Sequence, residues 1–126
     1  MIGGPNPSGI PGFNAATGIA ATTTGAANAV PLPSWFNVVT SSFTTNSAVS
    51  LPPGYASAAV TVVNNSTSNS IKVYGSGTDT IASSAVSTQV STGVSIAAGA
   101  YNIFMCILGE FGNTNNPQPA QWKAMF

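Results

Sequence analysis

The apolar residues of this sequence are arranged in short runs that Gly, Pro, Asn or Ser interrupts every few positions. From about residue 17 the runs contain small and β-branched side chains, and none keeps a helical period over a useful length. Residues 58–63 form one such run. Residues 71–74 form another in strict alternation, with Ile71 and Val73 expected to face the core. Because only a polar turn separates the two runs, we expect them to pair as a hairpin.

Five further segments have the same character and are expected to be strands: residues 35–39, 48–51, 92–96, 101–108 and 121–126. Residues 109–119, rich in Gly, Asn and Pro, are expected to be a long loop. The sequence therefore predicts an all-β fold over residues 16–126. Seven or eight short strands with frequent turns favour an antiparallel β-sandwich or jelly roll.

The run 101–108 is apolar on both of its predicted faces. Tyr101, Ile103 and Met105 lie on one face, and Phe104 lies on the other. A strand of this kind is covered on both sides, either by a second sheet or by another subunit. Tyr101, Ile103, Phe104 and Met105 are therefore candidate subunit contacts.

Residues 1–15 precede this domain and contain Gly or Pro at seven positions. That density excludes a helix or a strand ladder and predicts an extended N-terminal arm. Ile2, Ile10 and Phe13 are its isolated apolar side chains and are candidate anchors on a partner. A terminus without a role is the alternative.

Charged residues are almost absent from the chain. Lys72, Lys123, Asp79 and Glu110 make up 3% of it, whereas an ordinary soluble domain has about 25%. A free monomer relies on net charge to resist association, and the formal net charge here is zero. We therefore expect partners to cover most of the surface. A secreted or low-complexity chain, soluble through hydroxyls and amides, is the alternative.

The same composition excludes several classes of partner. No Arg is present, so the clustered cations that bind nucleic acid or anionic membranes are missing. No stretch reaches the roughly 18 apolar residues of a membrane span, and the first residues lack the pattern of a secretory signal. We expect a protein made in the cytoplasm that binds neither nucleic acid nor membrane.

Catalytic and metal-binding side chains are equally scarce. The chain has no His and a single cysteine, Cys106, which excludes an internal disulfide, a Ser-His-Asp triad, and zinc, haem and iron-sulfur sites. Cys106 lies in an apolar run and is expected to be buried and inert. Asp79 and Glu110 fall in different turns, and Asp79 is expected to accept backbone hydrogen bonds in its own turn. We predict no enzymatic activity, no cofactor and no metal. Calcium at backbone carbonyls and Asp79, and a Ser activated by Lys72 or Lys123, stay open as alternatives.

Two sequence patterns concern carbohydrate, one as a covalently attached glycan and the other as a bound ligand. Asn64 and Asn65 begin overlapping glycosylation sequences, which matter only in a secreted eukaryotic protein. Aromatic residues with neutral polar neighbours suit sugar stacking, although packing is their more frequent role. The candidates are Trp35, Phe36, Tyr55, Tyr74, Tyr101 and Trp122.

An ordered series of short motifs runs from about residue 22 to the C-terminus, none of them specific alone. The series is Val38-Val39-Thr40, Leu51-Pro52, residues 60–64, Lys72-Val73-Tyr74, residues 77–81, Gly93-Val94, Ala98-Gly99, residues 101–108 and Trp122. In this order and spacing the chain resembles small structural proteins of tailed phages that are encoded near the major capsid protein.

The resemblance implies a capsid decoration or cement protein, a virion protein on the outer surface of the phage head, commonly a trimer. The implied partners are the major capsid protein and further copies of the chain in a homotrimer. Ile2, Ile10 and Phe13 are then candidate capsid contacts. The segment 109–119 and the arm depart from the pattern. The alternative function is a carbohydrate-binding adhesion module, either a phage tail or head-fibre component or a free lectin-like domain.

We predict that chelating agents leave folding unchanged, because the chain lacks a recognisable set of metal ligands. Thermal unfolding followed by circular dichroism, with and without EDTA, is expected to give the same midpoint. A lower midpoint in EDTA would contradict this prediction.

Overall fold

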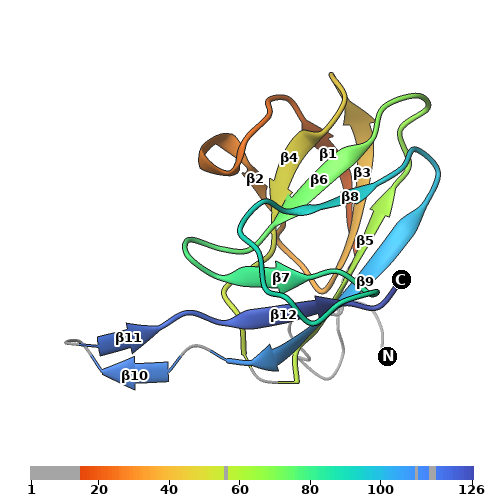
Figure 1. Cartoon of the computed structure of the whole chain (residues 1–126). Helices are drawn as coiled ribbons and strands as arrows, with labels where there is room; N and C mark the ends of the chain where they lie inside the picture. Colours follow the sequence, from red (N-terminus) through yellow and green to blue (C-terminus); the bar gives the residue numbers. More distant parts are fainter. Residues whose placement is uncertain (1–14, 56, 110, 114–115) are drawn as a thin grey trace, which may run out of the picture.

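The computed structural model describes residues 15–55, 57–109, 111–113 and 116–126 of the chain. These residues form twelve strands and one short 3₁₀ turn, η1 (Ala26–Asn28) (Figure 1). One sheet has six strands, in the spatial order β1 (Ala16–Ala21), β3 (Phe36–Ser42), β5 (Ala59–Asn64), β9 (Tyr101–Leu108), β12 (Gln121–Ala124) and β7 (Thr80–Ala82). A second sheet has four, in the order β2 (Val30–Pro31), β4 (Ser47–Ser50), β6 (Ile71–Tyr74) and β8 (Val94–Ile96). A two-stranded sheet is formed by β10 (Phe111–Asn113) and β11 (Asn116–Gln118). The predicted all-β class is confirmed.

The chain passes from one main sheet to the other after every strand from β1 to β8. Two successive strands of the same sheet are therefore separated by a crossing to the other sheet and a crossing back, and from β1 to β6 these two crossings return the chain in the same direction. As a result β1, β3 and β5 are parallel neighbours, as are β2, β4 and β6. Antiparallel pairs join β5 to β9, β9 to β12 and β6 to β8. Both main sheets are mixed, so the prediction of antiparallel sheets is wrong.

The hairpin predicted between residues 58–63 and 71–74 does not form. Both segments are strands, β5 and β6, but they belong to different sheets. Alternation predicted which side chains are buried, and Ile71 and Val73 are indeed fully buried. It does not specify the partner strand, because a strand that crosses to the opposite sheet has the same alternation as one that turns back in its own.

The segment 109–119, predicted to be a loop, contains β10 and β11. The two strands are antiparallel, with Gly112 opposite Pro117, and they project beyond the two main sheets (Figure 1). The sequence did not predict this two-stranded ribbon, because Gly, Asn and Pro are depleted in strands. Among the described residues the strand count also exceeds the seven or eight expected, since several strands have only two to four residues.

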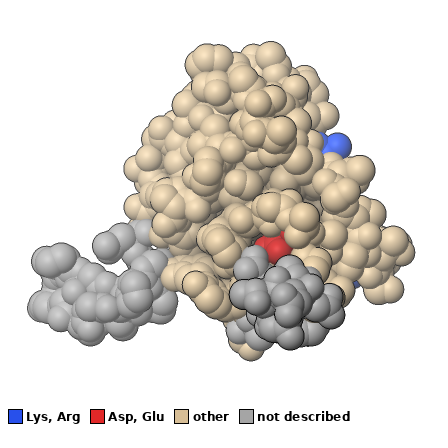
Figure 2. All heavy atoms as spheres, turned by 90° about the vertical axis from the view of Figure 1, so that its left-hand side faces the viewer, with Lys and Arg blue, Asp and Glu red and all other residues tan. Residues whose placement is uncertain are grey.

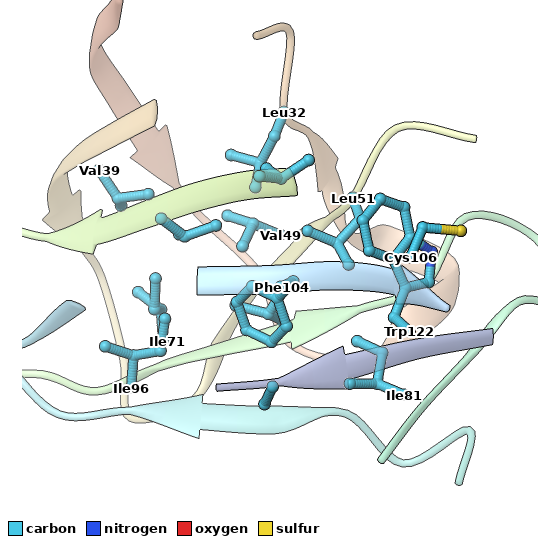
Figure 3. Packing of buried hydrophobic residues seen from close by; sticks show 14 of the residues in the cluster. Leu32, Val39, Val49, Leu51, Ile71, Ile81, Ile96, Phe104, Cys106 and Trp122 are labelled. Carbon is cyan, nitrogen blue, oxygen red and sulfur yellow. The ribbon is translucent and has the colours of Figure 1, made fainter. Parts of the chain in front are cut away.

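The two main sheets share one hydrophobic core (Figure 3). Its members include Val39, Val60, Val62, Phe104 and Trp122 from the six-stranded sheet and Val49, Ile71, Val73 and Ile96 from the four-stranded sheet. Each of these side chains is at most 2% exposed. Burial of one such side chain contributes about 1.5–3 kcal/mol, so the shared core is the main attraction between the sheets. Cys106 belongs to the same cluster and is buried, as predicted.

Gly54 allows the loop before β5 to approach β9 and β12 closely. A Cβ atom at this position would lie 2.5 Å from Ala120 Cβ and 2.9 Å from Cys106 Sγ. Both neighbours are buried, so neither can move aside without disturbing the core. A glycine is therefore required here for packing.

The amide of Asn64, at the end of β5, connects the crossing from β5 to β6 with the four-stranded sheet. Its Nδ2 donates to the carbonyl oxygens of Asn69 and Ile96, both at 3.0 Å. Its Oδ1 accepts from the N–H of Ser66 at 3.2 Å and from the Ser66 hydroxyl at 2.7 Å. Asn64 is fully buried and Asn65 is exposed, so only the glycosylation sequence that begins at Asn65 has an accessible amide.

We predict that Asn64→Ala lowers the free energy of unfolding by roughly 2–4 kcal/mol, because the buried partners of the amide are left unsatisfied. Asn65→Ala is the matched control, since that side chain is exposed and its removal changes stability by less than about 0.5 kcal/mol. Urea unfolding followed by circular dichroism measures both variants. Equal stabilities would contradict the role assigned to Asn64.

Candidate interaction face

Alternate residues of β3, β5 and β9 point away from the core and form an outer surface of the six-stranded sheet. In β9, residues 102, 104 and 106 are buried, while Tyr101 is exposed and Ile103 and Met105 are half-buried. The two residues after β12 extend this surface, because Met125 N–H donates to the Ile103 carbonyl oxygen and Phe126 contacts Tyr101. We call this surface the outer face. It consists of Phe36, Val38, Ala59, Thr61, Val63, Tyr101, Ile103, Met105, Ile107, Met125 and Phe126.

The strand register aligns the side chains of the outer face in rows that cross the sheet. The rows are Val38, Val63 and Tyr101; Phe36, Thr61 and Ile103; and Ala59, Met105 and Lys123. Directly opposite side chains on neighbouring strands have Cβ atoms about 4.5–5.5 Å apart. The rows therefore form one continuous, mostly apolar surface over β3, β5 and β9.

Large apolar side chains on the outer face are exposed to solvent. Phe36 is 43% exposed, Tyr101 and Ile107 are both 54%, Met125 is 47% and Phe126 is 64%. With roughly 200 Å² for a fully exposed aromatic side chain, the three rings alone leave about 300 Å² in contact with solvent. This is close to the largest apolar patch of a typical monomer, and the aliphatic residues of the outer face enlarge it further.

Tyr101 and Phe126 form an aromatic pair at one end of the outer face. Their ring centroids are 5.6 Å apart and their planes meet at 68°, an edge-to-face arrangement. Asn102 holds Phe126 in place, since its Oδ1 accepts from the Phe126 N–H at 3.1 Å and its Nδ2 donates to the Phe126 carbonyl oxygen at 3.2 Å. The rings are not coplanar, so the pair does not form a flat platform for a sugar ring.

Lys123 ends the third row and is the only charged side chain in the three rows. Its Nζ donates to the carbonyl oxygen of Ser83, at 2.7 Å, and to that of Val86, both in the segment that follows β7. Gln89 of the same segment donates from Nε2 to the Trp122 carbonyl oxygen at 3.1 Å. The ammonium group is therefore directed toward the β7 edge of the sheet, and the side chains of the outer face itself are uncharged.

Asp79 is buried before the start of β7 and connects that strand with β12. Its Oδ1 accepts from the N–H of Ala120 at 2.8 Å, a residue 41 positions later in the chain, rather than from its own turn as predicted. Its Oδ2 and the Nε1 of Trp122 are buried without a hydrogen-bond partner. Within the described ranges, no three or more His, Cys, Asp or Glu side chains lie together as a metal site, and no helix is long and apolar enough to cross a bilayer.

The structure separates the residues that the sequence grouped as subunit contacts. Tyr101, Ile103 and Met105 lie on the outer face, but Phe104 is fully buried in the core. The assignment of Phe104 is wrong because successive residues of a strand point to opposite sides, and its side belongs to the shared core. The candidate capsid contacts Ile2, Ile10 and Phe13 lie outside the described residues.

Sequence reasoning missed the part of the outer face that β3, β5 and the C-terminal residues contribute. Phe36, Val38 and Val63 alternate with buried residues, and that alternation was a signal in the sequence. What the sequence lacked was the strand order, which places β3 and β5 beside β9. Neither a scan against family models nor searches of curated proteins and solved structures found a match to this chain.

We predict that Lys123→Met loosens the segment that contains Ser83 and Val86, because two hydrogen bonds to its carbonyl oxygens are lost. The expected loss of stability is about 1 kcal/mol. Lys72→Met, which changes the other lysine of the chain, is the control. Hydrogen exchange measured by mass spectrometry should become faster in residues 83–93 only in Lys123→Met. The same exchange rate in both variants would contradict the stabilising role of the hydrogen bonds from Lys123 to Ser83 and Val86.

Proposed function

We propose that this chain is a non-catalytic structural protein of a phage virion, a capsid cement or decoration protein that binds the outer surface of the head and bridges capsomers. The observation that carries the proposal is the outer face, an exposed apolar sheet surface on a chain with very few charged residues. Figure 2, which views the side of the molecule that lies on the left in Figure 1, also shows few charged side chains. Surfaces of this kind are typical of proteins whose working state is an assembly.

The fold is consistent with such a role. We infer that the two main sheets are the layers of a β-sandwich, because one core takes side chains from both. Parallel neighbours in both sheets fit a sandwich with repeated crossings better than a jelly roll of antiparallel strands. A close-packed body of this kind can transmit force between the subunits it bridges without rearranging.

The proposed mechanism is mass action. A protein that binds only the assembled shell stabilises that state in proportion to the logarithm of its free concentration over its Kd. The attraction comes from buried apolar surface, at about 25 cal/mol per Å², and it is repeated at many equivalent sites on the shell. No residue needs to perform chemistry in this mechanism.

The proposed partners are the major capsid protein and further copies of the chain in a homotrimer. The sequence of the N-terminal arm supports contact with the shell, since Ile2, Ile10 and Phe13 are apolar anchors spaced along a segment rich in Gly and Pro. An extended residue spans at most about 3.3–3.6 Å, so such an arm reaches some 40 Å and can cross to a neighbouring subunit.

A carbohydrate-binding adhesion module is the second candidate function. Tyr55 is 68% exposed and Phe43 is 64% exposed, and each offers an aromatic ring to a ligand. The edge-to-face geometry of Tyr101 and Phe126 does not add a stacking platform to these single rings. A glycan screen of wild type and Tyr55→Ala tests this candidate, which predicts sugar binding that the substitution weakens.

We predict that the full chain binds undecorated shells of the major capsid protein encoded beside it and raises the temperature at which those shells dissociate. Deletion of residues 2–13 should weaken shell binding at least about tenfold, which corresponds to 1.4 kcal/mol. The midpoint of thermal unfolding should change little, because the Gly and Pro content of residues 1–15 predicts little contribution of this segment to folding. Co-sedimentation with shells and thermal unfolding measure the two effects.

Two results would contradict this prediction in different ways. If the full chain does not bind shells, the proposed function is wrong. If the truncated chain binds as tightly as the full chain, the arm has no role in attachment, and the outer face or another surface must carry it.

A further inference from the structure

We infer that the outer face is the surface through which copies of this chain bind one another. The inference identifies the contact surface of the homotrimer in the proposed function. Only the number of copies, three, rests on that proposed function. It is carried by the area, charge and rigidity of the outer face.

The area of the outer face is of the order that a stable contact requires. A standard interface buries about 800 Å² on each partner. The three aromatic rings supply about 300 Å² by the estimate above, in which a fully exposed ring has roughly 200 Å². Ile107 and Met125, each about half exposed, and the half-buried side chains of Val38, Val63 and Ile103 enlarge this area. Aromatic residues and Met are also the types enriched at the centres of interfaces.

The charge of the outer face suits contact with an identical surface. In a symmetric assembly a charged group near the axis meets its own copy, and like charges brought together cost several kcal/mol. Among the described residues no side chain of the outer face is charged, and Lys123 at its margin donates to the carbonyl oxygens of Ser83 and Val86. Lys72, the other lysine, lies on β6 in the opposite sheet.

The outer face is also held rigid before any partner binds. β9 is paired on one side with β5 and on the other with β12, so its backbone cannot shift. Asn102 fixes Phe126 by two hydrogen bonds and thereby orients the ring against Tyr101. A preorganised surface loses little conformational entropy on association, which favours binding. A second copy offers a surface of the same extent, the same chemistry and the same rigidity.

Substitutions that introduce charge on the outer face test the inference, and the molecular mass of the protein in solution is the quantity measured. Light scattering after size-exclusion chromatography should give the wild-type chain, at micromolar concentrations, a multiple of 12.6 kDa. Phe36→Glu combined with Tyr101→Glu should weaken association at least about thirtyfold, or about 2 kcal/mol, because like charges would be buried in the contact. Phe43→Glu is the control, since Phe43 is 64% exposed, more than Phe36 or Tyr101, but lies off the outer face. A wild-type chain of 12.6 kDa at every concentration, or a folded double variant that associates like wild type, overturns the inference.

Crosslinking gives a second test that does not depend on charge. Thr61 lies in the middle of the central row, and Thr45 lies in an exposed turn before β4. A short bismaleimide should join copies of Thr61→Cys but not of Thr45→Cys, and Cys106 does not compete because it is buried. Equal crosslinking of the two variants overturns the inference.

Binding to shells separates this inference from the proposed function. Association and Thr61→Cys crosslinking without shell binding support the inference and refute the function. Shell binding by a chain that stays monomeric and gives no Thr61→Cys crosslink supports the function and overturns the inference.

Discussion

The shared core between the two main sheets is the constraint on which the rest of the structure depends. The chain changes from one main sheet to the other after every strand from β1 to β8, so each sheet is assembled from alternate strands and neither is complete until the other forms. Several of these strands have only two to four residues, and ladder hydrogen bonds alone would not keep them ordered. Burial of Phe104 and Trp122 from one sheet against the valines and isoleucines of the other supplies the stability that the short strands lack.

Buried amides specify how the chain enters and leaves the strands. Asn37 accepts from the Ser34 N–H and donates to the carbonyl oxygens of Ser34 and Thr61. Asn64 connects the end of β5 with Ser66, Asn69 and Ile96, and Asn102 fixes the last residue of the chain against β9. A buried amide costs free energy unless its hydrogen bonds are made, so each of these residues favours one register over its alternatives. In a chain with almost no charged residues, neutral amides take the role that ion pairs have elsewhere.

The outer face follows from the same alternation. Every residue that β9 directs into the core is flanked by two that point outward, and in this chain the outward residues are also apolar. A monomer with many charges would interrupt such a surface with Lys or Glu. Here the scarcity of charge leaves the surface continuous from Phe36 to Phe126. The properties that make the chain a poor free monomer are those that suit a component of an assembly, and they link its composition to the function proposed for it.

The sequence by itself determined the all-β class, the positions of β6 and β9, and the burial of Ile71, Val73 and Cys106. These properties depend on side-chain alternation and on composition, which are local. Only the tertiary structure decided that β5 and β6 lie in different sheets, that residues 109–119 contain a ribbon of two strands, and that Phe104 belongs to the core. Strand order depends on which distant segments pair, and a period of two residues is the same for a strand that turns back and for one that crosses over. The outer face was therefore visible in the sequence as separate alternating strands, and only the packing of the two sheets joined it into one surface.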